Sequence, residues 1–118
     1  MEKFCVIRNI YRSIVEYESQ FEKLYHISLN EGMLLCSLAE NGRLSSGEIA
    51  SLLGLTASNT SKVIKASERK ELIHRILGNT DKRQMYFSLT AEGHKKIIEL
   101  KNSNINIPEH LIDIIDKI

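Results

Sequence analysis

Apolar residues recur every three or four positions along the first 25 residues of the chain. Positions 7, 10, 14, 17, 21 and 24 form a heptad-like stripe, which neighbouring apolar side chains widen. The pattern predicts a helix of about six turns over residues 2–25. A small domain cannot bury so broad an apolar surface, so we expect the helix to pair with a second copy of the chain. Packing within one chain is the alternative.

Two shorter helices are predicted next. The first covers residues 31–40, with Asn30 as its cap. The second opens at Ser45 and Glu48, which have the spacing of a capping box. Residues 43–44 are expected to form a short extended link between them.

A further helix is predicted over residues 56–71, with Thr56 as its cap. The surface of this helix is unusual. Its first turns carry hydroxyls, an amide and two ammonium groups: Ser58, Asn59, Thr60, Ser61, Lys62 and Lys65. Such groups suit base edges and phosphate oxygens. A solvated surface helix is the alternative interpretation. The tight turn before this helix favours a helix-turn-helix, although core helix pairs also have such turns.

A β-hairpin is predicted after this helix. Residues 72–77 and 84–89 have the composition of strands, and a turn cluster separates them. The tip carries Asp81, Lys82 and Arg83. A hairpin directly after a helix-turn-helix is a wing, and an arginine at its tip suits the negative potential of a minor groove. Alternatively, Asp81 and Arg83 only pair with each other.

Two closing helices complete the pattern. Thr90 is placed to cap a helix that continues to about residue 102, and Pro108 suits the first position of a last helix. The last helix is too short to be stable alone. We expect it to pack against the first helix, across a dimer interface.

Charge is unevenly distributed along the chain, whose formal net charge is only +1. Between Arg43 and Lys96 lie ten basic and five acidic residues, so this middle part carries +5 and the remainder −4. A basic middle part is typical of a module that binds a polyanion such as nucleic acid.

The composition also limits the location of the protein and the roles of its cysteines. Apolar runs fall far short of the roughly 18 residues that span a bilayer, so no membrane partner is expected. No signal peptide is visible, which predicts a cytoplasmic location, at the nucleoid if DNA is the partner. Cys5 and Cys36 form no spaced pair and are expected to be small buried hydrophobes.

Catalysis is not expected. The four histidines, His26, His74, His94 and His110, are scattered over separate predicted elements. No nucleophile stands beside a base in the sequence, and no glycine-rich loop for phosphates is present. We therefore predict that the protein is not an enzyme and needs no metal or other cofactor.

The order of elements resembles the MarR family of bacterial transcription regulators. Matching residues run from about Leu29 to Lys96, and the most specific are Asp81 and Arg83 of the wing and the Leu-Thr-x-x-Gly that begins at Leu89 and ends at Gly93. The resemblance implies a mainly α fold with a small β-hairpin wing, in one domain over residues 1–118. Residues 29–100 would form the winged helix-turn-helix core, and residues 2–25 and 108–118 the dimerisation helices.

The resemblance also implies which residues bind DNA. The polar positions of the helix over 56–71 would lie in or beside the major groove, and Arg83, positioned by Asp81, would enter the minor groove. Additional contacts would come from Ser45, Ser46, Arg75 and Lys82. A homodimer would bind a roughly palindromic operator on double-stranded DNA. The predicted function is sequence-specific binding to double-stranded DNA by a transcription regulator that acts as a repressor.

Two departures from the family pattern lie near the end of this helix. Family members usually have leucine where this chain has Ser67 and glycine where it has Glu71. We therefore expect different packing and geometry at that end.

Regulation has two predicted routes. Members of the family commonly respond to small aromatic compounds, for which Tyr11, Tyr17, Tyr25 and His26 are the candidate residues, with core packing as the alternative. Cys5 is the candidate for a redox-sensing regulator of the same family. A different class remains open as well, namely a winged helix that contacts proteins and does not recognise a DNA sequence.

Overall fold

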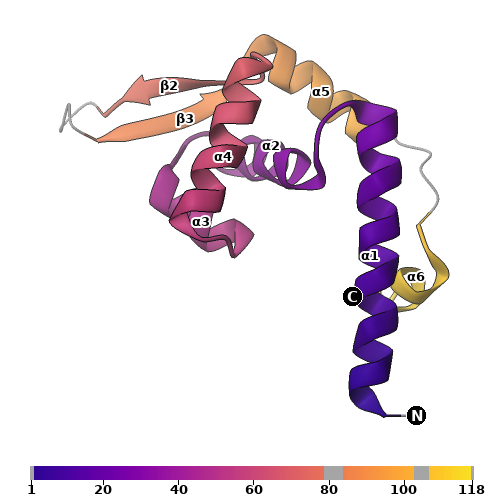
Figure 1. Ribbon diagram of the computed structural model, residues 1–118. Helices are drawn as coiled ribbons and strands as arrows, with labels where there is room; N and C mark the ends of the chain where they lie inside the picture. Colours follow the sequence, from indigo (N-terminus) through magenta and orange to yellow (C-terminus); the bar gives the residue numbers. More distant parts are fainter. Residues whose placement is uncertain (1, 79–83, 103–106, 118) are drawn as a thin grey trace. The chain divides into compact units, whose positions relative to one another are not determined.

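The computed structural model describes residues 2–78, 84–102 and 107–117 (Figure 1). In these residues the elements follow in the order α1 (Lys3–Tyr25), α2 (Leu29–Asn41), β1 (Leu44–Ser45), α3 (Ser46–Leu53), α4 (Ala57–Arg69), β2 (Ile73–Leu77), β3 (Met85–Leu89), α5 (Ala91–Lys101) and α6 (Glu109–Ile115). The mainly helical architecture with a small antiparallel sheet confirms the predicted fold class.

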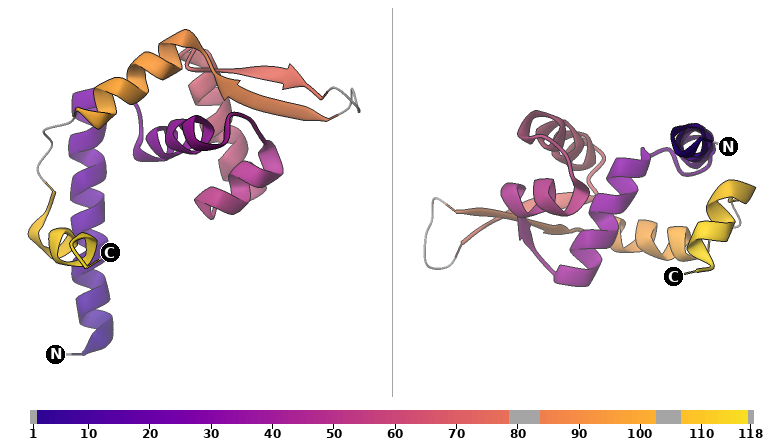
Figure 2. Two further views of the ribbon diagram at one scale, coloured as in Figure 1. Left: turned by 180° about the vertical axis from the view of Figure 1, so that it is seen from behind. Right: turned by 90° about the horizontal axis from the view of Figure 1, so that it is seen from below.

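The chain divides into two compact units, Asn30–Ser103 and the two ends, Met1–Leu29 with Asn104–Ile118. In the unit made by the two ends, α6 lies alongside α1 (Figure 2). Large apolar side chains on both helices remain exposed: Phe4, Val6, Ile7, Tyr11, Val15, Leu24, Ile112, Ile114 and Ile115. The packing of α6 on α1 within one chain therefore leaves much of the predicted dimerisation surface uncovered, and dimerisation itself stays a prediction.

The unit over residues 30–103 is built on a three-stranded antiparallel sheet in the order β1-β3-β2. Helices α3 and α4 contact each other, and each also contacts the sheet. The core is formed by buried apolar side chains from every element: Leu34, Leu35, Leu38, Leu44, Ile49, Ile64, Leu72, Ile73, Phe87, Leu89 and Ile97. This core holds α4 against the β2–β3 hairpin.

Strand β1 corrects the prediction of a simple extended link at residues 43–44. Leu44 pairs with Phe87 and Ser45 with Tyr86, both on β3. These partners lie about 40 residues further along the chain, so the local pattern carries no signal for the pairing.

The capping box at the start of α3 is confirmed. The Glu48 backbone N–H donates to Ser45 Oγ at 3.2 Å, and the Ser45 N–H donates to Glu48 Oε1 at 2.9 Å. The hydrogen bonds that the Glu48 carboxyl accepts from Ser45, chiefly the one from the Ser45 backbone N–H, lower its pKa because they stabilise its charged form. The cap fixes where α3 begins.

Two other predicted helix starts are shifted. Helix α2 begins at Leu29, so Asn30 lies within its first turn and does not precede it. Pro108 is the residue before α6 and not its first helical residue. Both shifts are of one or two residues, the usual uncertainty at helix ends.

The start of α5 explains the Leu-Thr-x-x-Gly pattern. Thr90 Oγ1 accepts a hydrogen bond from the Gly93 N–H at 3.0 Å and donates to the Glu71 carbonyl at 2.6 Å. The Thr90 N–H donates to the Leu72 carbonyl at 3.1 Å. A Cβ atom on Gly93 would collide with that same Leu72 carbonyl oxygen. Glycine is required because α5 approaches the backbone of the α4–β2 corner.

No helix among the described residues is both long enough and apolar enough to cross a membrane.

We predict that Gly93→Ala destabilises the protein, because the new methyl group forces α5 away from the Leu72 carbonyl. The free energy of unfolding should fall by roughly 1–3 kcal/mol, the usual cost of overpacking, in urea titrations followed by circular dichroism. Gly47→Ala is the matched control, since nothing lies within 4 Å of a Cβ there. Equal stability of the two variants would contradict the close approach.

Candidate nucleic-acid interface

Helix α4 follows α3 after a short turn. Gly54 closes α3 in the left-handed conformation, with φ of 66°, and the Leu55 N–H donates to the Ala50 carbonyl at 3.0 Å. Thr56 caps α4 as predicted, its Oγ1 accepting from the Asn59 N–H at 3.1 Å. The two helices thus form the predicted helix-turn-helix, with α4 in the position of the second helix.

The inner side of α4 is a narrow stripe of three residues. Thr60, Ile64 and Ser67 are buried, at spacings of four and three that place them on one helical face. The Thr60 hydroxyl donates to the Thr56 carbonyl at 2.7 Å. The prediction that Thr60 contacts DNA is therefore wrong, because only 2% of the residue is exposed and its hydroxyl is already hydrogen-bonded within α4.

The outer side of α4 carries the other predicted residues. Ser58, Asn59, Ser61, Lys62 and Lys65 are all exposed. In the described part of the 30–103 unit, salt bridges are formed by other cations: Lys70 with Glu31, Arg75 with Glu68, Lys95 with Glu92 and Lys96 with Glu99. Among the described residues, no carboxylate lies within salt-bridge distance of Lys62 or Lys65. Two ammonium groups on the outer face of α4 are thus available to an external anion.

A cavity of about 330 Å³ brings five predicted residues together from three elements. It is lined by Ser46 from α3, by Ser61, Lys65 and the buried Thr60 from α4, and by Arg75 from β2, together with apolar residues that include Phe87. Ser46 is exposed, whereas the neighbouring Ser45 is half-buried and its Oγ accepts the capping hydrogen bond. Ser58, Asn59 and Lys62 lie on the part of α4 away from this cavity's lining.

Arg75 is not available in the same way as the two lysines. Its Nε donates to Glu68 Oε2 at 2.8 Å and its Nη2 to Glu68 Oε1 at 3.1 Å. These hydrogen bonds, together with the carboxylate's charge, raise the pKa of the guanidinium. Arg75 therefore links β2 to the last turn of α4.

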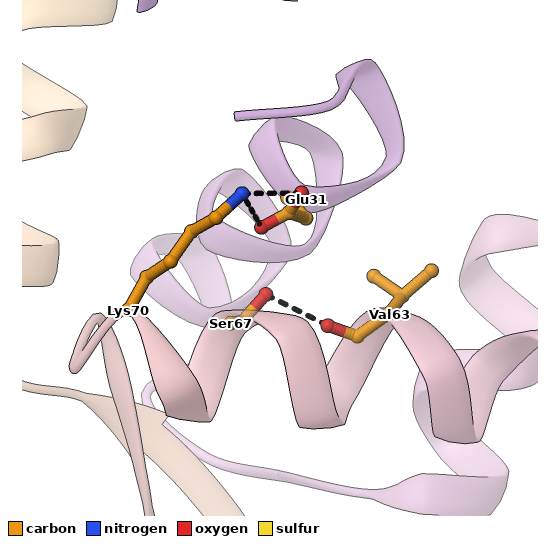
Figure 3. Close-up of polar contacts among 4 residues, drawn as sticks. All are labelled: Glu31, Val63, Ser67 and Lys70. Atoms are coloured by element: carbon orange, nitrogen blue, oxygen red, sulfur yellow. Dashed lines mark hydrogen bonds and ion pairs between the residues drawn. The ribbon is translucent and has the colours of Figure 1, made fainter. Parts of the chain in front are cut away.

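The last turn of α4 is also held from α2, as Figure 3 shows. Lys70 Nζ donates to both carboxylate oxygens of Glu31, at 3.0 and 2.9 Å. The Glu31 side chain is 6% exposed and that of Lys70 41%. A buried carboxylate without a cation is costly, so the pair constrains where α4 ends relative to α2.

The structure explains how the end of α4 accommodates Ser67 and Glu71, where the MarR-like sequence pattern usually has leucine and glycine. Ser67 is fully buried, and its hydroxyl donates to the Val63 carbonyl at 2.9 Å (Figure 3), which satisfies the polar group without another chain segment. Glu71 has φ of 61°, in the left-handed region that glycine enters freely. The helix therefore ends in a glycine-like backbone conformation although a glutamate is present.

The residues of the predicted wing tip, Asp81, Lys82 and Arg83, lie outside the described residues. Next to the Leu77–Met85 pair, at the end of the strands away from α4 and α5, the Gly78 N–H donates to the Gln84 carbonyl at 2.8 Å. The strands that carry the tip are paired in register from Ile73 with Leu89 to Leu77 with Met85.

The candidate effector residues do not form one site in the unit made by the two ends. Tyr17 and Tyr25 each contact the ring of Phe21, with centroids 6.0 and 4.9 Å apart, and Tyr25 is buried. Burial, and secondarily Tyr25, raises the pKa of Tyr17. Tyr11 and His26 are exposed. Of the four, Tyr11 lines an open cavity of about 580 Å³ along α1. An effector site stays a prediction.

The cysteines differ from expectation. Cys36 is exposed and Cys5 half-buried, and neither forms a disulfide. The expectation of two buried cysteines is therefore wrong, because both lie on helix faces that the described residues do not cover completely. A redox role for Cys5 stays a prediction. Within the described ranges, no group of three or more histidine, cysteine, aspartate or glutamate residues is placed to hold a metal ion.

The fold and the arrangement of α3, α4 and the hairpin define a winged helix-turn-helix protein. Residues 27–85, half of the chain, match the sequence profile of the MarR family. The chain belongs to the MarR family.

Individual relatives agree with this assignment. An uncharacterized HTH-type transcriptional regulator, YwaE from Bacillus subtilis, is 30% identical over 104 residues, which cover 85% of this chain. The match spans 61% of that relative's length.

Solved structures extend the similarity to three dimensions. The MepR–DNA complex from Staphylococcus aureus is 26% identical, with a TM-score of 0.65, over 80% of this chain and 78% of MepR. The transcriptional regulator BldR from Sulfolobus solfataricus is 25% identical, with a TM-score of 0.74, over 99% of this chain and 96% of BldR.

We predict that Glu71→Gly stabilises the protein. Glycine adopts a positive φ without the steric cost that a Cβ brings, and this gain exceeds the extra entropy of the unfolded chain. The free energy of unfolding should rise by roughly 0.5–1 kcal/mol, measured by urea titration. The control is Glu40→Gly, in the exposed last turns of α2, which should lower stability. A destabilised Glu71→Gly variant would show that the glutamate side chain contributes more than its backbone costs.

Proposed function

We propose that the protein binds double-stranded DNA as a homodimer and regulates transcription. The observation that carries the proposal is the outer face of α4. It presents Lys62 and Lys65 without carboxylate partners among the described residues, next to exposed hydroxyls and the Asn59 amide. Unpaired ammonium groups bind phosphates, and amides and hydroxyls bind base edges.

The proposed contacts divide between affinity and sequence choice. Lys62, Lys65 and the exposed hydroxyl of Ser46 contact phosphates, which supply most of the binding free energy. Ser58, Asn59 and Ser61 reach base edges in the major groove, and Asn59 is the best candidate for a bidentate contact with adenine. At the wing tip, Lys82 adds a phosphate contact, and Arg83, positioned by Asp81, enters the adjacent minor groove.

Two copies of the chain are proposed to pair through α1 and α6. The exposed apolar side chains of these helices supply a surface that water disfavours, as in other dimer interfaces. A two-fold dimer places two α4 helices in successive major grooves, so the operator should be pseudo-palindromic.

The related proteins support the same function. MepR, 26% identical to this chain, has been solved as a complex with DNA, and both YwaE and BldR are described as transcriptional regulators. Location at the nucleoid and repression of the bound promoter are parts of the proposal.

We predict that Lys62 and Lys65 contribute measurably to the salt dependence of DNA binding. Each phosphate contact releases counterions, and each substitution removes one contact from each copy of the homodimer. Lys62→Gln and Lys65→Gln should therefore each reduce the slope of log affinity against log salt by roughly 1.8, or 0.9 per copy. The measurement is a salt titration of a fixed duplex by fluorescence anisotropy. Lys95→Gln is the control, because that exposed lysine already pairs with Glu92 on α5. A wild-type affinity that does not change with salt would contradict DNA binding through phosphates.

We predict that Asn59→Ala changes base preference at one position of each half-site. Selection of bound fragments from a random duplex pool, carried out with wild type and variant, compares the two preferences directly. The discrimination lost should be roughly 1–3 kcal/mol. Asn41→Ala is a control, because the Asn41 amide donates to the Ser37 carbonyl at the end of α2. Identical selected sequences for wild type and Asn59→Ala would remove Asn59 from the recognition of bases.

A further inference from the structure

The guanidinium of Arg75 is engaged at each of its three nitrogens. Nε and Nη2 donate to the two oxygens of Glu68, and Nη1 lies 3.5 Å from Met85 Sδ. The carbon at the centre of the group stands 5.8 Å from the centroid of the Phe87 ring. Both ends of the fork and one face of the plane are thus in contact with other residues.

These contacts join α4 to both strands of the hairpin. Glu68 is in the last turn of α4, with 23% of its side chain exposed, and Arg75 is in β2. Phe87 is the cross-strand partner of Arg75, and Met85 lies two residues before it on β3. A bidentate pair between a planar guanidinium and a carboxylate fixes orientation as well as distance.

The pair therefore has the geometry to set the angle between the helix and the hairpin. Between Glu68 and Arg75 the chain turns a corner at residues 70–72, where Glu71 takes its left-handed conformation. Backbone hydrogen bonds from Leu72 to the Ser67 carbonyl and from Glu71 to the Glu68 carbonyl close that corner. The side-chain pair spans the corner from outside and adds a second constraint on its opening.

We propose that Glu68 and Arg75 are positioning residues, which together hold the hairpin at the angle to α4 that a DNA duplex requires, and that Arg75 is not a phosphate ligand. The inference rests on the proposed function and deepens it. It replaces the sequence-based prediction that Arg75 contacts DNA.

Charge also argues against a phosphate contact by Arg75. A DNA phosphate that bound the Arg75 guanidinium would have to displace the Glu68 carboxylate. The carboxylate would then lie unneutralised beside the phosphate. Because like charges in proximity repel, the exchange gains little. Because Glu68 already neutralises Arg75, DNA binding by this pair would release no additional counterions. Lys65, which lines the same cavity, would release them.

The test measures specific and non-specific affinity for duplex DNA, each as a function of salt. The variants are Arg75→Gln, Glu68→Gln and Arg75→Lys, with Lys65→Gln as the phosphate-contact control. We expect all three pair variants to weaken binding to the selected site by roughly fivefold. Arg75→Lys keeps the charges of the pair, so it should leave the non-specific affinity and the salt slope at wild-type values, and Arg75→Gln should reduce the slope by less than Lys65→Gln does. In its specific affinity Arg75→Lys should resemble Arg75→Gln, because lysine keeps the charge but loses the bidentate fork.

Several results would overturn the inference. One is a salt slope that Arg75→Gln reduces as much as Lys65→Gln does. The others are a specific affinity that Arg75→Lys retains in full, and a Glu68→Gln variant that binds the selected site more tightly than wild type. The proposed function fails separately, if wild type selects no sequence and Lys65→Gln leaves the slope unchanged. In that case amide hydrogen exchange of the free protein still decides on the pair: faster exchange of β2 amides in Arg75→Gln and Glu68→Gln supports the constraint, and unchanged exchange contradicts it.

Discussion

Helix α4 must be held firmly by very few apolar side chains, and the rest of the 30–103 unit is arranged around this constraint. Its outer face is given to hydroxyls, an amide and lysines, and its inner stripe contains one large apolar residue, Ile64, between two buried hydroxyl groups. Burial of a single isoleucine contributes only about 1.5–3 kcal/mol. Polar contacts at both ends of the helix supply the remaining constraint. The Thr56 cap fixes the start, and the Lys70 and Arg75 ion pairs fix the last turn against α2 and the sheet.

Ion pairs of this kind specify position more than they stabilise. The desolvation of the Glu31 carboxylate offsets much of its attraction to Lys70, whereas removal of the lysine alone would cost this buried carboxylate both hydrogen bonds from Lys70. Orientations of α4 that separate Lys70 from Glu31 are penalised for the same reason. The close approach of α5 at Gly93 acts at the same corner of the chain, where the backbone of Leu72 receives both the glycine and the Thr90 N–H. Helix α2, strand β2 and helix α5 therefore contact the chain at or just after the end of α4, which suits a helix that must present its outer face at a defined angle.

The sequence predicted those features whose cause is local. The caps at Ser45 and Thr56 depend on residues three positions apart, and both are present. Strand β1 was missed because its partner on β3 is distant in the chain. Thr60 was assigned to the interface by residue type, although its spacing from Ile64 and Ser67 already places it on the inner stripe. The pairs of Glu31 with Lys70 and of Glu68 with Arg75 were not predicted, because they depend on how helices and strands meet in space. The outer residues of α4 are exposed, as the interpretation requires.

The central claim is that the outer face of α4 meets the DNA while its inner stripe and its two ion pairs remain as they are in the free protein. A crystal structure of the chain bound to its selected duplex tests this directly. We expect Asn59, Lys62 and Lys65 in or beside the major groove, Thr60 still buried, and the Arg75 fork still on the Glu68 carboxylate. A complex in which α4 faces away from the duplex would contradict the account.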